Sequence, residues 1–177
     1  MNNNAIPGAW KRAVMVPIYK GGDRLVVGNY RPVSLTSVVC KQMEHVTARY
    51  LGEVWEMSGW LYEGQHGFRM GYSCESQVVT VCQDIADSLD EGVRTDTIIM
   101  DFSKAFDLVP RDRLLTKIAA TGVDLRVVVW IKKDFFLGRS QRVRVDGQLY
   151  EEVRVTSGVP EGSVLGPLLF LPSVNDI

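Results

Sequence analysis

The sequence of 177 residues lacks the features that mark membrane and secreted proteins. No apolar run approaches the roughly 18–20 residues that a membrane-spanning helix needs. Residues 1–14 contain neither the apolar core nor the cleavage pattern of a secretory signal. The three cysteines, Cys40, Cys74 and Cys82, have neither zinc-site spacing nor the even count of a disulfide framework. These absences predict a reduced, intracellular chain with no membrane partner.

Neither sign of charge dominates the chain, which has 20 Lys and Arg against 21 Asp and Glu. The distribution is uneven, because residues 1–50 contain seven basic and two acidic side chains, residues 53–101 two and ten, and residues 111–154 ten and six. Two basic stretches around an acidic one are consistent with a protein that contacts phosphates on one surface and binds metal on another. Solvated faces of any globular protein would give the same pattern.

No repeat or flexible linker interrupts the chain, and 46% hydrophobic and 23% charged residues are typical of one packed globular domain. Hydrophobic periodicity and turn residues predict the elements. The predicted strands are 13–19, 33–35, 97–100 and 141–145 with a return through Asp146-Gly147, and the predicted helices begin near 37, 74, 111 and 125. Strands and helices do not alternate strictly, which favours an α+β domain over a doubly wound one.

Asp101 is the strongest candidate for chemistry. The preceding apolar run at 97–100 is typical of a strand buried on both faces. Because desolvating a carboxylate is costly unless it is paired or metal-bound, an aspartate at the end of such a strand is a candidate magnesium ligand. A simple turn or helix cap is the alternative role for Asp101.

Two glycine-rich loops are weaker candidates. Glycines in Ser157–Pro167 would let backbone N–H groups approach a bulky ligand before a helix, although an ordinary loop-to-helix junction has the same composition. In Gln65–Gly71, an arginine and an aromatic residue between glycines could bind phosphate or stack on bases, or form a plain surface loop.

In combination these segments are far more specific. In this order and spacing the chain resembles the reverse transcriptases of non-LTR (LINE-type) retrotransposons and, more distantly, those of group II introns. The resemblance runs from about Trp10 to Ile177. Its five blocks are Val16–Asp23, Asn29–Leu35, Gln65–Arg69, Asp101–Asp107 and Ser157–Ser163.

The resemblance implies a right-hand polymerase of fingers, palm and thumb. It predicts that 1–177 is a partial reverse transcriptase domain, with about 1–65 and 111–157 fingers-like and about 66–110 and 158–177 palm-like. The palm hairpin with the aromatic-Ala-Asp-Asp block and the thumb would be lacking. The implied reaction transfers a nucleotide from a dNTP to a primer 3′-hydroxyl, with an RNA template, a DNA primer and two Mg²⁺ ions. A eukaryotic retroelement protein of this kind would work in the nucleus or the cytoplasm, and its oligomeric state is not indicated.

The resemblance assigns roles to the block around Asp101. Asp101 matches the catalytic aspartate that binds both metal ions, and the backbone carbonyl of Phe102 matches a further metal ligand. The backbone N–H groups of Lys104 and Ala105 match donors to the triphosphate. Phe106 matches the aromatic residue that packs against the sugar and excludes a ribonucleotide 2′-hydroxyl.

Other site residues are implied in the remaining blocks. Gly162 matches the glycine beside the nucleotide and template, and Arg69, Arg31 and Lys20 match basic residues near template or nucleotide phosphates. Glu161 stands where the family has glutamine. A carboxylate there would repel a triphosphate unless it is protonated or salt-bridged, so we expect Glu161 to weaken nucleotide binding.

Two further departures affect the expected activity. Pro172 falls where the family continues a helix, and an interior proline should kink or end it at a cost of about 3 kcal/mol. The aspartate pair that completes the metal site would follow Ile177, so we expect the chain as given not to polymerise DNA. The alternatives are a non-enzymatic remnant that at most binds nucleic acid through Arg69, Arg142 and Arg144, and an unrelated magnesium phosphotransferase.

Overall fold

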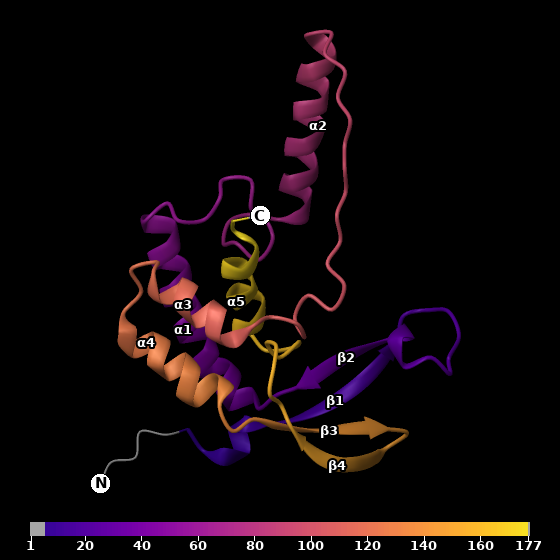
Figure 1. Ribbon diagram of the computed structural model, residues 1–177, viewed down its shortest axis with the longest axis vertical. Coiled ribbons are helices and arrows are strands. Elements are labelled where there is room, and N and C mark those ends of the chain that lie inside the picture. The colour runs from indigo at the N-terminus through magenta and orange to yellow at the C-terminus, as the bar shows by residue number, and fades with distance from the viewer. Residues whose placement is uncertain (1–5, 177) are drawn as a thin grey trace.

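A computed structural model describes residues 6–176 and shows a sheet beside a group of packed helices (Figure 1). The helices are α1 (Val38–Met57), α2 (Cys74–Asp90), α3 (Arg111–Ala119), α4 (Leu125–Trp130) and α5 (Leu165–Val174), with short helical turns η1 (Gly8–Lys11), η2 (Val27–Asn29) and η3 (Ile131–Phe136). The strands are β1 (Arg12–Tyr19), β2 (Tyr30–Leu35), β3 (Ser140–Val145) and β4 (Gln148–Arg154). The predicted α+β class is confirmed.

The sheet joins two parts of the chain that are far apart in sequence. Its order is β2-β1-β3-β4, with β1 antiparallel to β2 and β3 antiparallel to β4. The central pair β1 and β3 is parallel, with Arg12 opposite Ser140 and Met15 opposite Val143. The predicted Asp146-Gly147 hairpin turn is confirmed, and both residues have the positive φ of a tight two-residue turn.

The hydrophobic core lies among the helices rather than under the sheet. The predicted inward face of α3 is confirmed, since Leu114, Leu115 and Ile118 are all buried. Trp55 of α1 is fully buried, and its indole N–H donates to the Thr121 hydroxyl at 2.9 Å. Two predicted helix caps are also confirmed, with Ser37 at α1 and Asp124 at α4.

The predicted strand at 97–100 is wrong. Residues 93–100 form no strand, and Ile98, Ile99 and Met100 are largely exposed. They run beside α2, away from the sheet (Figure 1). An apolar run becomes a buried strand only where neighbouring strands take its hydrogen bonds and other elements cover its faces, and no strand of residues 6–176 pairs with it. Asp101 therefore does not end a central strand.

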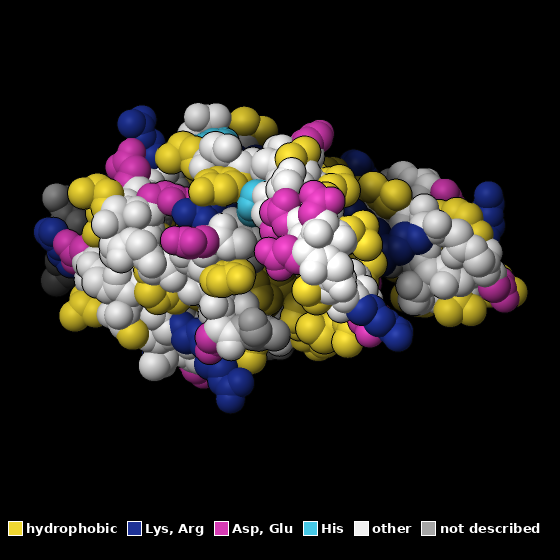
Figure 2. Space-filling model, turned by 90° about the horizontal axis from the view of Figure 1, so that it is seen from above, with side chains coloured by type: hydrophobic (Ala, Val, Ile, Leu, Met, Phe, Trp, Pro, Cys, Tyr) yellow, Lys and Arg dark blue, Asp and Glu magenta, His cyan; other side chains and the backbone are white. Residues whose placement is uncertain are grey.

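Helix α2 is confirmed as a helix but none of its side chains is buried. Its predicted apolar face is open, with Val78 60% and Leu89 70% exposed. Seen from above, α2 points toward the viewer and shows acidic and hydrophobic side chains next to each other (Figure 2). The amphipathic pattern thus predicted the helix correctly, whereas its burial depends on neighbours that the sequence pattern does not specify.

Pro172 does not end α5, which continues to Val174. The proline cannot donate a backbone hydrogen bond to the carbonyl of Leu168. Its ring is fully buried beside the core residues Leu169 and Leu171. We attribute the continuation of the helix to this burial, which offsets the lost hydrogen bond.

Candidate functional site

The loop 157–163 and the segment 101–109 are docked together by their backbones. Val159 N–H donates to the Phe106 carbonyl at 2.8 Å, and Gly158 N–H donates to the Val109 carbonyl at 3.3 Å. Gly158 has φ +69, and a Cβ there would lie 2.6 Å from the carbonyl oxygens of Phe106 and Asp107. Only glycine fits this close approach. The structure thus brings together two segments that the sequence singled out separately.

The same loop is also fixed to the sheet at β2. Ser34 N–H donates to the Glu161 carbonyl at 2.8 Å. Gly162 has φ +100, and a Cβ there would lie 2.5 Å from the Ser34 carbonyl oxygen. The Glu161 carboxylate forms an ion pair with the Arg31 guanidinium of β2. Two predicted site residues therefore touch, and the carboxylate at 161 is salt-bridged.

A cavity of about 340 Å³ lies between this loop and the sheet. Met15 and Ser34 line it from the strands, and Ser157 and Glu161 line it from the loop. Asp107, Arg139 and Arg154 add charges of both signs. The cavity is therefore polar on the loop side and offers both donors and acceptors to a ligand.

The segment 101–106 presents its polar groups to solvent. Asp101, Phe102 and Lys104 are exposed. Lys104 has φ +53 and lies in a turn in which its carbonyl accepts from the Asp107 N–H at 3.0 Å. Phe106 is half-buried, with its ring centre 5.3 Å from that of Phe170. Phe102 also contacts the Phe170 ring, with 6.2 Å between the ring centres. The aromatic contacts hold this segment on α5.

The side chains of the described residues do not by themselves make up a magnesium site. Residues 6–176 contain no group of three or more His, Cys, Asp or Glu side chains placed to hold a metal ion. Asp101 offers one exposed carboxylate. Magnesium prefers six oxygen ligands, of which proteins usually supply one or two carboxylates beside substrate phosphates. A pair of ions is not accommodated by this donor set, so we derive no catalytic step through a metal.

Arg69 is held by α1 rather than left open. Its guanidinium donates to both carboxylate oxygens of Glu56, at 2.7 and 2.9 Å, and to the Tyr62 carbonyl at 3.2 Å. It also lies 4.3 Å from the centre of the Tyr72 ring. The hydrogen bond from Arg69 lowers the pKa of Glu56, and the same bond raises the pKa of Arg69. A role at a template remains a prediction for this residue.

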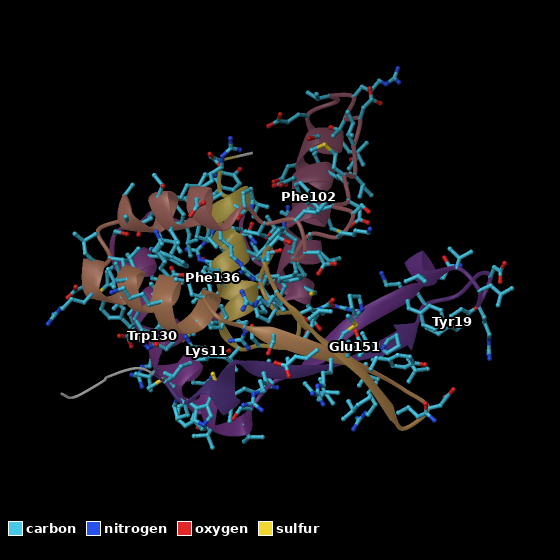
Figure 3. The ribbon with its side chains drawn as sticks, turned by 60° about the horizontal axis from the view of Figure 1, so that its bottom comes forward. Lys11, Tyr19, Phe102, Trp130, Phe136 and Glu151 are labelled. Atoms are coloured by element: carbon cyan, nitrogen blue, oxygen red, sulfur yellow. The ribbon has the colours of Figure 1, made fainter. Side chains whose placement is uncertain are left out.

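Lys20 lies apart from the docked loop. It is exposed and directly follows β1, and its neighbour Tyr19 lies at the far tip of the sheet (Figure 3). Of the ten predicted site residues, the docked segments thus contain Asp101, Phe102, Lys104, Ala105, Phe106, Glu161 and Gly162, and Arg31 joins them through its ion pair.

Two residues that hold the loop were not predicted. Arg111 donates to the carbonyls of Gly158 at 2.8 Å, Ser157 at 2.9 Å and Val155 at 3.1 Å. Glu44 accepts from the backbone at the start of α5. A sequence signal existed for both residues. A basic side chain in the first turn of a helix opposes the helix dipole, and Glu44 shares the helical spacing of the buried Cys40, Leu51 and Trp55.

None of the helices in the described part of the chain is long and apolar enough to cross a bilayer.

Residues 18–177 match the reverse transcriptase (RNA-dependent DNA polymerase) family. The chain therefore belongs to the reverse transcriptase family, whose members generally use divalent metal ions.

Within this family the similar proteins come from non-LTR retrotransposons, as predicted. The chain is 32% identical, over 97% of its length, to a protein of transposon BS from Drosophila melanogaster. It is 30% identical, again over 97%, to the RNA-directed DNA polymerase from mobile element jockey of the same species. The jockey polymerase of Drosophila funebris is 30% identical over 93% of the chain. The chain spans about a fifth of the length of these relatives, 18–19%.

Proposed function

We propose that this chain is part of an RNA-directed DNA polymerase of a non-LTR retrotransposon. The whole protein would transfer nucleotides from dNTPs to a primer 3′-hydroxyl on an RNA template. The observation that carries this proposal is the backbone docking of the loop 157–163 on the segment 101–109. This docking places the glycine loop against Phe106, in the same short segment that begins with the candidate metal ligand Asp101.

The proposed division into fingers and palm is supported by the contacts within each part. Strands from 1–65 and from 111–157, the proposed fingers-like ranges, share one sheet. In the proposed palm-like ranges, 66–110 and 158–177, the segment near Phe106 contacts the loop and α5. The outer limits of this division, residues 1–5 and 177, lie outside the described residues.

The proposed roles of single residues follow the family blocks. Asp101 and the Phe102 carbonyl are proposed as the metal ligands that this chain contributes, with Mg²⁺ as the ion. The backbone N–H groups of Lys104 and Ala105 would bind the triphosphate. Phe106 would contact the sugar, and its packing on Phe170 supports a fixed ring position that could exclude a 2′-hydroxyl.

Glu161, Gly162 and the basic residues would complete the nucleotide and template contacts. Arg31 is the best supported cation, because its side chain is 57% exposed and lies beside the loop. Lys20 and Arg69 are proposed as further phosphate contacts. Bound partners would be RNA, DNA and dNTPs, with the chain at work in the nucleus or cytoplasm.

Primer extension tests the proposal. A chimera in which residues 18–177 replace the matching segment of the jockey polymerase should extend a primer on an RNA template, and Asp101→Ala should abolish extension. The isolated chain should extend nothing, because the side chains of residues 6–176 do not complete a metal site. Magnesium-dependent extension by the isolated chain, lost in Asp101→Ala, would contradict its proposed inactivity. Equal activity of chimeras with and without Asp101 would contradict the proposed role of that residue.

The alternative of a non-enzymatic remnant predicts a different result. A remnant would bind RNA through Arg69, Arg142 and Arg144 with strong salt dependence, and its chimera would incorporate no nucleotide in any variant. The pairing of Arg142 with Glu152 at 3.6 Å does not favour this alternative. The inward contacts of Arg69 weigh equally against its role in both proposals.

Replacing Glu161 with glutamine should strengthen triphosphate binding. The carboxylate now pairs with Arg31, so an anionic ligand must compete with it for the guanidinium. Glutamine keeps the shape and removes the charge. We expect the affinity for inorganic tripolyphosphate to rise about tenfold, the equivalent of roughly 1.4 kcal/mol, as measured by titration calorimetry.

The matched control is Glu151→Gln on β4, an exposed carboxylate that changes the net charge equally. It should leave the affinity within about twofold, since Glu151 forms no ion pair with Arg31 and salt screens a solvent-exposed charge. Unchanged or weaker binding in Glu161→Gln would show that Glu161 does not oppose the ligand.

A further inference from the structure

Glu44 is a fully buried carboxylate on α1, with 0% of its surface exposed. One of its oxygens, Oε2, accepts from Val164 N–H at 2.8 Å and from Leu165 N–H at 3.2 Å. These are the first amides of α5, and the N-cap residue Val164 supplies no side-chain cap of its own. Two side chains therefore cap the start of this helix: Glu44, 120 positions away in the chain, accepts from Val164 and Leu165, and the Ser163 hydroxyl accepts from Gly166 N–H at 2.9 Å.

The other oxygen of Glu44 is held by a buried neighbour. The Cys40 thiol donates to Oε1 at 3.4 Å. Burial, followed by the charge of Glu44, raises the pKa of Cys40 to about 11, so the thiol keeps its proton and its role as donor. Arg139, only 3% exposed, also faces this group and contributes a positive charge toward Glu44. The carboxylate is thus fixed on both sides.

The position of this cap matters because of what precedes it. Glu161 and Gly162 lie just before Val164, and Ser163 joins them to the helix. On its other flank the loop is held by Arg111, and in its middle by Ser34 of β2. At the end that leads into α5, Ser163 is held only by local contacts, since its hydroxyl donates to the Pro160 carbonyl at 2.8 Å and accepts from Gly166 N–H. Glu44 adds the contact that ties this end to α1, so its loss would loosen the end of the loop.

We propose that Glu44 is a positioning residue, which fixes the start of α5 and thereby holds Glu161 and Gly162 in place against β2. The link to ligand binding rests on the proposed function of this loop at the nucleotide. Glu44 itself touches no ligand in this account. It acts through the two amides that it accepts from, so its removal should change the loop without removing any ligand contact.

The test uses the whole chain in three variants. Glu44→Ala removes both acceptor oxygens. Glu44→Gln keeps one acceptor oxygen and the shape of the side chain, so it should keep most of the hold on the amides of Val164 and Leu165. Glu53→Gln is the matched control, because Glu53 lies on the same helix and its side chain is 47% exposed. Hydrogen exchange is followed residue by residue, and inorganic tripolyphosphate is titrated into each variant.

We expect Glu44→Ala to speed exchange at residues 160–168 by roughly tenfold or more, the effect of leaving buried donors without a partner. The exchange rates in β1 and β3 should stay unchanged. The affinity for tripolyphosphate should fall at least about fivefold, because the loop is then less often in its binding position. Glu44→Gln should show a smaller increase confined to the same residues, and Glu53→Gln should match the original chain. If Glu44→Ala does not fold, a local increase in Glu44→Gln, smaller but confined to 160–168, carries the same conclusion.

The remaining outcomes separate the two proposals. Faster exchange throughout the chain would overturn the inference, because Glu44 would then only stabilise the fold. Faster exchange confined to residues 160–168, with unchanged tripolyphosphate affinity, would overturn the link between Glu44 and the ligand. Local exchange in a chain where no variant binds tripolyphosphate would support Glu44 as the anchor of the loop and count against the proposed function of the loop.

Discussion

Replacing Gly158 with alanine should detach the loop 157–163 and destabilise the chain by about 3–5 kcal/mol. The residue has φ +69, which L side chains rarely adopt, and the new Cβ would lie 2.6 Å from two backbone carbonyl oxygens. Neither obstacle can rotate away, since both belong to the backbone. A domain of this size is stable by about 5–15 kcal/mol, so the loss should be visible in urea unfolding followed by tryptophan fluorescence.

Gly92→Ala is the matched control for this prediction. Gly92 has the same φ of +69, but nothing lies within 4 Å of a Cβ built there. Gly92→Ala should therefore lose only the stability that the strained backbone costs, about 1–2 kcal/mol. If Gly92→Ala and Gly158→Ala lost the same amount, the close approach of the loop to Phe106 and Asp107 would not be present in solution.

Replacing Arg111 with methionine should cost about 2–4 kcal/mol in the free energy of unfolding. The guanidinium donates to three carbonyls of the segment 155–158 and lies 5.0 Å from the centre of the Phe136 ring. Burial, followed by the charge of Arg139, lowers the pKa of Arg111, so the hydrogen bonds must offset a desolvated cation. Methionine fills similar space but leaves the carbonyls without donors.

Two variants control this prediction. Arg111→Lys keeps the charge but cannot reach several carbonyls with one ammonium, so it should recover less than about half of the loss. Arg113→Met, on the exposed side of the same helix, should change stability by less than about 0.5 kcal/mol. Equal losses in Arg111→Met and Arg113→Met would contradict a specific role for Arg111 at the loop.

The local elements of this fold were predictable because their signals are local. Ser37 and Asp124 mark helix starts, Asp146-Gly147 marks a hairpin, and the apolar spacing in α3 marks its buried face. Each depends on residues within a few positions of one another. The helix-forming pattern of α2 was read correctly for the same reason.

Long-range pairings were not predictable from these patterns. The parallel pairing of β1 with β3 joins segments whose sequences give no sign that they pair. The apolar run at 97–100 has the composition of a strand, but no strand in the described part of the chain pairs with it. The burial of Pro172 likewise depends on the core around α5. In each case the tertiary surroundings outweigh the local preference.

The candidate site likewise has a part that the sequence predicts and a part that it does not. The residue types in the blocks around Asp101 and Gly162 indicated chemistry and, through the family resemblance, a common site. The contacts that assemble this site are made by Arg111, Glu44 and the Arg31–Glu161 pair, and they link residues far apart in the chain. A sequence motif indicates which chemical groups the site contains, whereas the contacts that support the site depend on how the whole chain packs.

The parallel pairing of β1 and β3 has a consequence for biosynthesis. On the ribosome, β1 and β2 can form their antiparallel pair early, but the inner edge of β1 must wait until Val143 has emerged. Contacts between such distant segments slow folding, and an open strand edge invites pairing with other chains. The nascent protein therefore passes through a long interval in which this edge needs shielding, and chaperone demand should fall sharply once β3 is translated.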